Sequence, residues 1–160
     1  MSAPEITWSF PVNTKGGVFC LEGTSQGLYR VTFPKGKGEK RKSSLSGGQK
    51  QGLVFIRYFK NPGAKLKLRM DLSGCTAFEK QVYRALCKVP PGKVISYSAL
   101  AKRAGFPGAA RAVGSAMRKN RLPVVIPCHR VIHEDGTLGR YSGGIRWKKF
   151  LLKHEGSLKK

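Results

Sequence analysis

The chain has 160 residues, 40% of them hydrophobic, so it is long enough for one domain of ordinary size or two small ones with packed cores. Its charge is one-sided: 31 Lys and Arg against 8 Asp and Glu give a formal net charge of +23, which indicates a polyanionic partner. Nucleic acid fits better than an anionic membrane surface, because the basic residues are not gathered on one long amphipathic helix. Charge that serves only solubility is the alternative.

The cysteines and the N-terminus bear on the compartment. Cys20, Cys75, Cys87 and Cys128 are spread without a CxxC pair, which argues against a disulfide scaffold and a zinc knuckle. No apolar stretch reaches the length of a membrane span, and residues 1–5 lack the pattern of a signal peptide. We therefore expect an intracellular protein without membrane association, in the nucleus of a eukaryote or the cytoplasm of a prokaryote.

A β-hairpin is predicted near the N-terminus. Residues 18–21 and 28–33 are rich in β-branched and aromatic side chains, and residues 23–27 between them carry turn chemistry. Residues 34–52, mostly Lys, Gly and Ser, are predicted to be a basic, mobile loop. The apolar residues 53–59 fit either a strand or a helix. Alternating apolar residues then predict another strand: Leu66, Leu68, Met70 and Leu72.

The second half of the chain is predicted to be more helical, and it begins with a helix start signal. Thr76 and Glu79 have the spacing of a capping box, in which each side chain satisfies an amide of the first helical turn. Apolar residues follow at helical spacing: Phe78, Val82 and Leu86.

Two shorter helices, joined by a glycine-containing turn at residues 105–108, form a helix-turn-helix pattern. Ser96 or Ser98 caps the first, and the second extends over about residues 109–119. One face of this second helix is apolar: Ala109, Ala112, Val113 and Ala116. Another face carries two arginines separated by small residues: Arg111, Gly114, Ser115 and Arg118. A nucleic-acid backbone can come close to such a face, although a tight helix–helix contact through small residues is the alternative.

The last part of the chain alternates turns with a helix. Asp135 and Gly136 predict a tight hairpin turn that resembles the wing of a winged helix. Residues 139–144 are glycine-rich, but no GK[ST] follows them, so a P-loop is not expected. A final helix is predicted over residues 145–155 and ends at Gly156.

Residues 126–130, Ile-Pro-Cys-His-Arg, place the thiol of Cys128 next to the imidazole of His129. Neighbouring side chains do not face each other on a regular helix or strand, so a proton relay between them needs an irregular turn or a bridging water. The alternative is an inert buried thiol beside a surface imidazole.

Several segments of the second half together resemble the O6-alkylguanine-DNA alkyltransferases. The similarity extends in order from about Phe78 to Gly156, and before residue 72 only the loose strand pattern agrees. The segments that carry it are residues 94–97 (VISY), 110–114 (ARAVG), 126–132 (IPCHRVI), 141–144 (YSGG) and 151–156 (LLKHEG).

This resemblance implies an α/β protein with a small N-terminal RNase H-like α/β domain, residues 1–72, and a C-terminal winged helix-turn-helix domain, residues 73–160. It implies DNA repair by a single-turnover methyltransferase that moves an alkyl group from O6 of guanine, and also from O4 of thymine, to its own cysteine. The implied partner is duplex DNA containing O6-alkylguanine, from which the base is flipped through the minor groove. We expect a monomer that needs no cofactor.

The resemblance also assigns roles to single residues. Cys128 would be the nucleophile and permanent acceptor, His129 the water-linked base, and Glu155 the carboxylate that orients and charges the imidazole. An imidazolium beside Cys128 would favour the reactive thiolate. Tyr97 would donate a proton to N3 of the leaving guanine, and Asn120 would brace the turn before the active-site segment.

The remaining roles concern DNA. Arg111 would fill the space that the flipped nucleotide leaves, while the small residues of the same helix would let it enter the minor groove. The expected DNA-binding residues are Arg111, Tyr97, Ser98, Gly114, Ser115 and Arg118. The expected base pocket comprises Met117, Val131, Tyr141, Ser142 and Gly143.

Some members of this family hold a structural zinc with two Cys and two His in the N-terminal domain. All three histidines here lie in the second half of the chain, so no zinc is expected. Three other functions remain open: an alkyltransferase-like protein that binds lesions without reacting, whose relatives lack the motif cysteine; a cysteine hydrolase with a Cys-His-Glu triad; and a sequence-specific winged-helix transcription factor.

Overall fold

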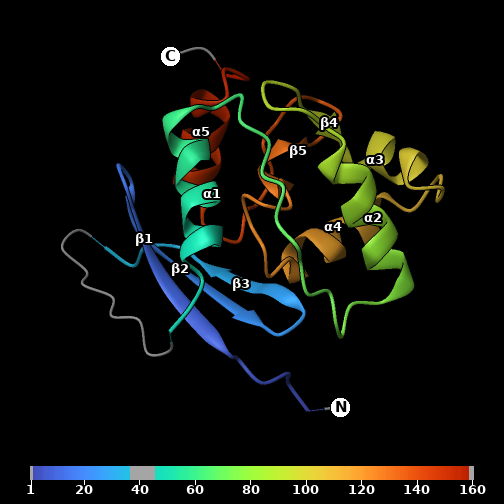
Figure 1. The fold of residues 1–160 in the computed structure, drawn as a ribbon. Coiled ribbons are helices and arrows are strands. Elements are labelled where there is room, and N and C mark those ends of the chain that lie inside the picture. Colours follow the sequence, from blue (N-terminus) through green and yellow to red (C-terminus); the bar gives the residue numbers. More distant parts are fainter. Residues whose placement is uncertain (1, 37–45, 159–160) are drawn as a thin grey trace. The chain divides into compact units, whose positions relative to one another are not determined.

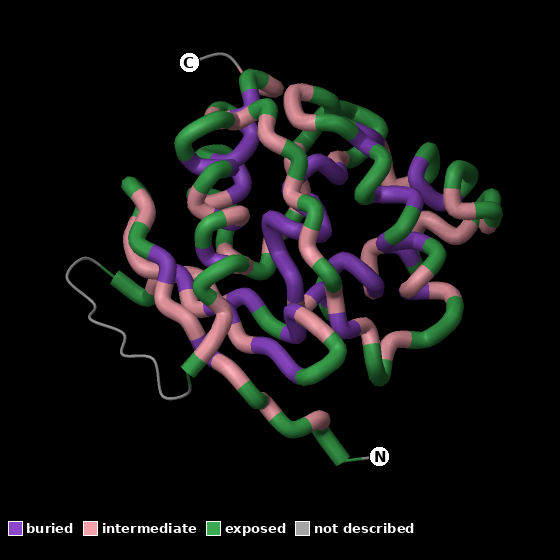
Figure 2. The backbone as a smooth tube through the Cα atoms, viewed as in Figure 1, coloured by how far each residue is buried: buried purple, intermediate pink, exposed green. Residues whose placement is uncertain are grey.

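Two units, Met1–Gly74 and Cys75–Lys160, divide the chain in a computed structural model that describes residues 2–36 and 46–158. Each unit has its own buried apolar residues, and Figure 2 colours all buried residues purple along the backbone tube. Both helices and strands are present, as expected for an α/β protein (Figure 1). No helix in the described ranges is long and apolar enough to cross a bilayer.

The first unit is a three-stranded antiparallel sheet with one helix. Its strands are β1 (Trp8–Thr14), β2 (Gly17–Thr24) and β3 (Gly27–Thr32), in the order β1-β2-β3. The helix α1 (Gln49–Lys60) packs aromatic rings against the sheet, with Phe55 lying 5.3 Å from Phe19 between ring centroids. The predicted β2–β3 hairpin is confirmed, and the ambiguous residues 53–59 belong to the helix.

Two predictions for the first unit were wrong in part. The basic loop was predicted to extend to residue 52, but α1 begins at Gln49; residues 37–45 of that loop lie outside the described residues. The predicted strand after residue 65 does not form, because the extended chain pairs with β3 at one point only, through Leu28 and Met70. That approach is close: a Cβ on Gly27 would lie 2.5 Å from the carbonyl oxygen of Arg69.

The second unit begins with the predicted capping box. In helix α2 (Ala77–Cys87), the Glu79 amide donates to Thr76 Oγ1 at 3.1 Å, and the Thr76 amide donates to Glu79 Oε2 at 2.9 Å. Glu79 Oε1 also accepts from Lys119 Nζ at 3.1 Å, at the end of helix α4 (Ala110–Lys119). The same carboxylate therefore starts one helix and links it to the end of another.

The predicted helix-turn-helix is present as α3 (Tyr97–Arg103) followed by α4. Ser96, not Ser98, is the cap, and its hydroxyl accepts from the Ala99 amide at 3.2 Å. On α4 the predicted apolar face is buried at Val113 and Ala116, but Ala112 is exposed. The short strand β4 (Ile95–Ser96) precedes α3 and pairs in parallel with β5 (Val131–Ile132).

The tight turn predicted at Asp135 and Gly136 is present. The His133 amide donates to Thr137 O at 2.9 Å, and no strand follows the turn in the described residues. The carbonyl of Leu138, just after the turn, accepts a hydrogen bond from the Lys148 ammonium. Helix α5 (Ile145–His154) then closes the unit, and Gly156 ends it in a left-handed conformation with φ 79°.

Thr76→Ala should destabilise the second unit by about 1 kcal/mol, because the Glu79 amide loses its cap. Urea unfolding followed by circular dichroism would measure the change. Thr76→Ser keeps the hydroxyl and serves as the control, so equal losses in both variants would show that the cap is not the cause.

Candidate active site

The predicted nucleophile lies in a buried segment. Every residue from 122 to 131 is buried, and Figure 2 shows this stretch as continuous purple backbone. Within it, Cys128, His129 and Arg130 form a short 3-10 turn, η1 (Cys128–Arg130). The irregular turn that a Cys-His pair requires is therefore present. The Cys128 side chain still reaches a pocket, whereas His129 is fully buried.

Asn120 holds this segment from the C-terminus of α4. Its Nδ2 donates to the Ile126 carbonyl at 3.0 Å and to Cys128 Sγ at 3.1 Å, and its Oδ1 accepts from the Leu122 amide at 2.9 Å. The loop it spans contains Val124 at φ 73°, a strained conformation for a β-branched residue. The predicted bracing residue thus also contacts the reactive sulfur.

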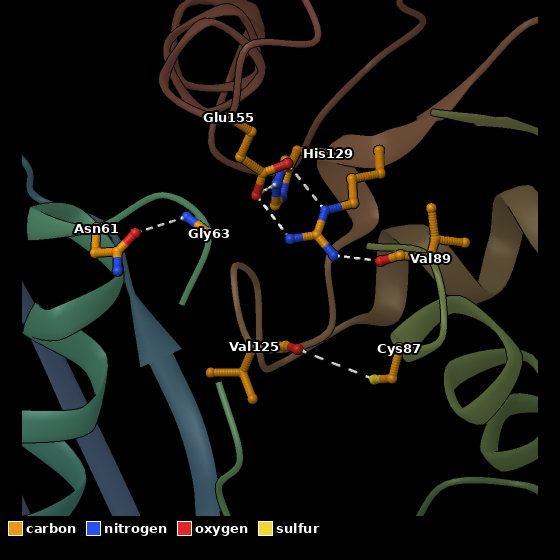
Figure 3. Close-up of polar contacts among 8 residues, drawn as sticks. Asn61, Gly63, Cys87, Val89, Val125, His129 and Glu155 are labelled. Carbon is orange, nitrogen blue, oxygen red and sulfur yellow. Dashed lines mark hydrogen bonds and ion pairs between the residues drawn. The ribbon is translucent and has the colours of Figure 1, made fainter. Parts of the chain in front are cut away.

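Behind the thiol, His129, Arg130 and Glu155 form a buried network (Figure 3). Glu155 Oε1 lies 2.8 Å from His129 Nε2 and accepts from Arg130 Nη2, also at 2.8 Å, while Oε2 accepts from Arg130 Nε at 2.9 Å. The remaining guanidinium nitrogen donates to the Val89 carbonyl. Both predicted residues, His129 and Glu155, are in contact, and Arg130 completes the network.

The network sets the charges of its members. Burial acts to raise the pKa of Glu155, but the hydrogen bonds from His129 and Arg130 and the positive charge of Arg130 outweigh it and lower that pKa to about 2. Burial also lowers the pKa of His129, against the opposing effect of Glu155. With Glu155 ionised and the imidazole neutral, Nε2 carries the hydrogen and donates it to the carboxylate. Nδ1 is then left with a lone pair, and it has no hydrogen-bond partner in the described part of the chain.

The cysteine is not a ready-made thiolate. Burial raises the pKa of Cys128, although hydrogen bonds from Asn120 and Tyr141 and the charge of Lys148 act in the opposite direction. Burial thus shifts the pKa values of both Cys128 and His129 toward favouring their neutral forms, and the role expected for an imidazolium stays a prediction. A thiol must lose its proton before it can act as a nucleophile.

Lys148 is a buried lysine that the sequence did not single out. Its side chain is fully buried on α5, and its Nζ donates to the Val131 carbonyl at 2.6 Å and to the Leu138 carbonyl. Burial lowers its pKa to about 8, while Cys128 raises it. Its signal in the sequence was its position: Lys148, Leu151, Leu152 and Glu155 share one face of the last helix.

The thiol opens onto a pocket of about 920 Å³ within the second unit. Nine of the expected site residues line it: Tyr97, Arg111, Gly114, Ser115, Met117, Arg118, Cys128, Tyr141 and Ser142. Three further residues, missed by sequence reasoning, complete the lining: Ala110, His133 and Arg140. The permanently charged side chains in the lining are all arginines. The pocket therefore suits an anionic ligand.

Of the residues expected to bind DNA or line the base pocket, three lie outside this lining. Ser98 is exposed on α3, with its hydroxyl 3.3 Å from that of Ser96. Val131 is fully buried in β5, where its carbonyl accepts from Lys148. Gly143 is half-buried and is not part of the lining either.

The small residues of α4 are not explained by packing inside the unit. A Cβ added to Gly114 would meet only one side chain within 4 Å, the ring of Tyr97 at 3.9 Å. Gly114 and Ser115 line the pocket together with Arg111 and Arg118. The alternative of a tight helix–helix contact at this face is therefore contradicted, and the open face is available to a ligand.

No group of three or more His, Cys, Asp or Glu side chains that could hold a metal ion occurs within residues 2–36 and 46–158. The polar groups around Cys128 are instead an amide and a phenol, which donate hydrogen bonds to the sulfur, and an ammonium that acts through its charge. The arrangement is that of a nucleophilic thiol with a buried acid–base pair behind it.

Comparison with known proteins gives a consistent picture. Residues 77–157 match the family described as 6-O-methylguanine DNA methyltransferase, DNA binding domain. A methylated-DNA–protein-cysteine methyltransferase of Methanosarcina acetivorans is 36% identical over 149 residues, covering 88% of this chain and 93% of that protein. One of Salmonella typhimurium is 46% identical over 101 residues, covering 63% of this chain, and the chain spans only 59% of its length.

Solved structures agree. Mycobacterium tuberculosis O6-methylguanine methyltransferase has a TM-score of 0.79 at 29% identity, covering 98% of this chain and 96% of that one. The M. tuberculosis OGT in complex with DNA has a TM-score of 0.78 at 32% identity, covering 93% and 92%. From the matched family region and the relative aligned over most of both lengths, the chain belongs to the methylated-DNA–protein-cysteine methyltransferase family.

Proposed function

We propose that this chain repairs DNA by moving an alkyl group from O6 of guanine to Cys128 and keeping it there. The observation that carries the proposal is that Cys128, Tyr97 and Arg111 line one and the same pocket. A thioether is stable, so the chain reacts once. The same chemistry would extend to O4 of thymine, and the chain would act as a monomer without a cofactor.

Duplex DNA is the proposed partner. A net charge of +23 favours a polyanion, and a related chain has been solved in complex with DNA. The α4 face with Arg111, Gly114 and Ser115 has room for a DNA backbone, since internal packing does not require its small residues. The helix would enter the minor groove, the alkylated base would flip into the pocket, and Arg111 would occupy its place in the stack.

We infer further that the two units correspond to an RNase H-like domain and a winged helix-turn-helix domain. The antiparallel sheet with α1 supports the first assignment, and α3 followed by α4 supports the second. We keep the domain boundary near residue 72 and an intracellular site of action as proposals.

The reaction begins with a neutral thiol. As the substrate carbon approaches, His129 Nδ1 takes the thiol proton through a water, and Glu155 stabilises the imidazolium that forms. Asn120, which donates to the sulfur at 3.1 Å, and the charge of Lys148 support the developing thiolate. Burial thus delays ionisation until substrate is present, which protects the thiol from other electrophiles.

The substitution is then balanced in atoms and charge. A bond forms between Cys128 sulfur and the alkyl carbon, the bond from that carbon to O6 breaks, and its electron pair moves into the guanine. Tyr97 donates the phenolic proton to guanine N3, so the base leaves neutral. Burial raises the pKa of Tyr97, which keeps the phenol protonated until transfer.

Incubation with duplex DNA containing O6-methylguanine should add one methyl group to the chain, and the modified peptide should contain Cys128. Intact-mass and peptide mass spectrometry measure both. Cys87→Ser should still react and Cys128→Ser should not. Binding with an unchanged mass would instead favour a lesion-binding protein, and repeated turnover would favour a hydrolase.

Arg111→Ala should slow the reaction with duplex DNA by at least about tenfold, because flipping a base costs a few kcal/mol. Its reaction with free O6-benzylguanine should be nearly unchanged, since no base needs to be flipped. Single-turnover rates on both substrates measure the difference. Arg103→Ala, an exposed arginine of α3 outside the pocket lining, is the matched control. Equal losses on both substrates would rule out a role in flipping.

Glu155→Gln should destabilise the chain at pH 7 by on the order of 3 kcal/mol, because the buried charge of Arg130 loses its partner. The folded-state pKa of Glu155, about 2, lies below its ordinary value of 4.5, so its stabilising effect is present above about pH 4.5 and is lost as the pH falls toward 2. Urea unfolding should therefore show that the difference in unfolding free energy between wild type and Glu155→Gln becomes smaller over this range. The same difference for the exposed Glu5→Gln should stay small throughout. A difference for Glu155→Gln that stays constant with pH contradicts the prediction.

A further inference from the structure

His133 stands beside Tyr97 in the pocket because of strand register. Ile95 pairs with Val131 and Ser96 with Ile132 in the parallel β4–β5 pair, so the next residue on each strand leaves the pair on the same side. Those residues are Tyr97 and His133, whose ring centroids lie 5.2 Å apart with their planes inclined by 44°. Both side chains line the pocket.

Two contacts hold this ring pair in place. Ser96 Oγ donates to Glu134 Oε1 at 2.6 Å, which ties the start of α3 to the residue after His133. Gly139, at φ 69°, lies against the polar edges of both rings: a Cβ there would be 2.8 Å from His133 Nε2 and 3.3 Å from Tyr97 Oη. The imidazole nitrogen and the phenol oxygen therefore converge on one point of the backbone.

We propose that His133, in its imidazolium form, is a positioning residue for Tyr97 that stabilises the phenolate left when the phenol gives its proton to the leaving guanine. This inference rests on the proposed function. His133 lies beside Tyr97 in the described site, and the proposed alkyl transfer gives it no other role.

Electrostatic stabilisation by His133 does not change which bonds form and break in the proposed transfer. Sulfur gains the alkyl carbon, guanine gains the electron pair and the phenolic proton, and the phenolate recovers a proton from solvent afterwards. His133 neither gains nor loses a proton in the step. A cation about 5 Å from a new negative charge lowers its energy, and more so once DNA covers the ring, which is exposed in the free chain.

Other charged groups act on His133 from its surroundings. Asp135 and Glu134 lie on the same turn, and hydrogen bonds from Thr137, together with the charge of His133, lower the pKa of the Asp135 carboxyl. Both carboxylates are anions close to His133 in the chain, whereas Arg118 from α4 and Arg140 from the following loop line the same pocket as cations, together with Cys128.

The proposal predicts a pH-dependent contribution. Imidazoles as a class change charge between about pH 5 and pH 8, so a contribution that needs an imidazolium should be larger at the acidic end of this range. Single-turnover rates at saturating duplex O6-methylguanine DNA are compared for wild type and His133→Gln, and their ratio cancels the titrations of Cys128 and His129. We expect a ratio of about three to five near pH 6 that falls to about one above pH 8, the size of a partly screened charge effect.

The matched control is His154→Gln, the same change at a histidine outside the pocket lining, which should leave the rate unchanged at every pH. In a Tyr97→Phe background, His133→Gln should have no further effect, because the residue acts through the phenol. A ratio that stays flat with pH, or an equal loss in the Tyr97→Phe background, overturns the inference. Wild-type chain that transfers no methyl group overturns the proposed function and this inference with it, whereas transfer with a flat ratio overturns the inference alone.

Discussion

The buried carboxylate of Glu155 is the interaction on which the second unit depends. It receives two hydrogen bonds from Arg130 and one from His129, and Arg130 continues to the Val89 carbonyl. One anion thus links the end of α5, the turn η1 and the segment after α2. Burying charges is costly, and the two-pronged contact with the guanidinium is the geometry that offsets this cost. Because His129 adjoins Cys128, the same contact that stabilises the fold also orients the site.

Burial governs the chemistry as much as the geometry does. The Cys128 thiol, the His129 imidazole and the Lys148 ammonium are all buried. Burial shifts the pKa of each group in the direction that favours its neutral form. A resting thiolate would be reactive toward any electrophile that entered the pocket. A neutral thiol with an acceptor imidazole behind it becomes reactive when substrate is aligned. This protection from other electrophiles matters for a protein whose proposed acceptor cysteine reacts only once.

The pocket wall shows how a few short strands place several functional groups. The β4–β5 pair is only two residues long on each strand, yet its register puts Tyr97 beside His133. Asn120 ends α4 and reaches the sulfur, so the helix that would enter DNA and the nucleophile are joined by one side chain. Arg111 and Gly114 on that helix open onto the same pocket. We therefore propose that one connected set of residues both contacts DNA and transfers the alkyl group.

Local patterns in the sequence determined the features that depend on neighbouring residues: the Thr76–Glu79 cap, the β2–β3 hairpin and the helices α3 and α4. The motif resemblance identified Cys128, Tyr97 and Glu155 as site residues. Only the tertiary structure decided what depends on distant partners. It showed that residues 66–72 meet β3 at a single bridge, and that the Leu138 carbonyl accepts a hydrogen bond from the Lys148 ammonium. It also showed that burial raises the pKa of the Cys128 thiol, because desolvation is a property of the surroundings and not of the sequence pattern.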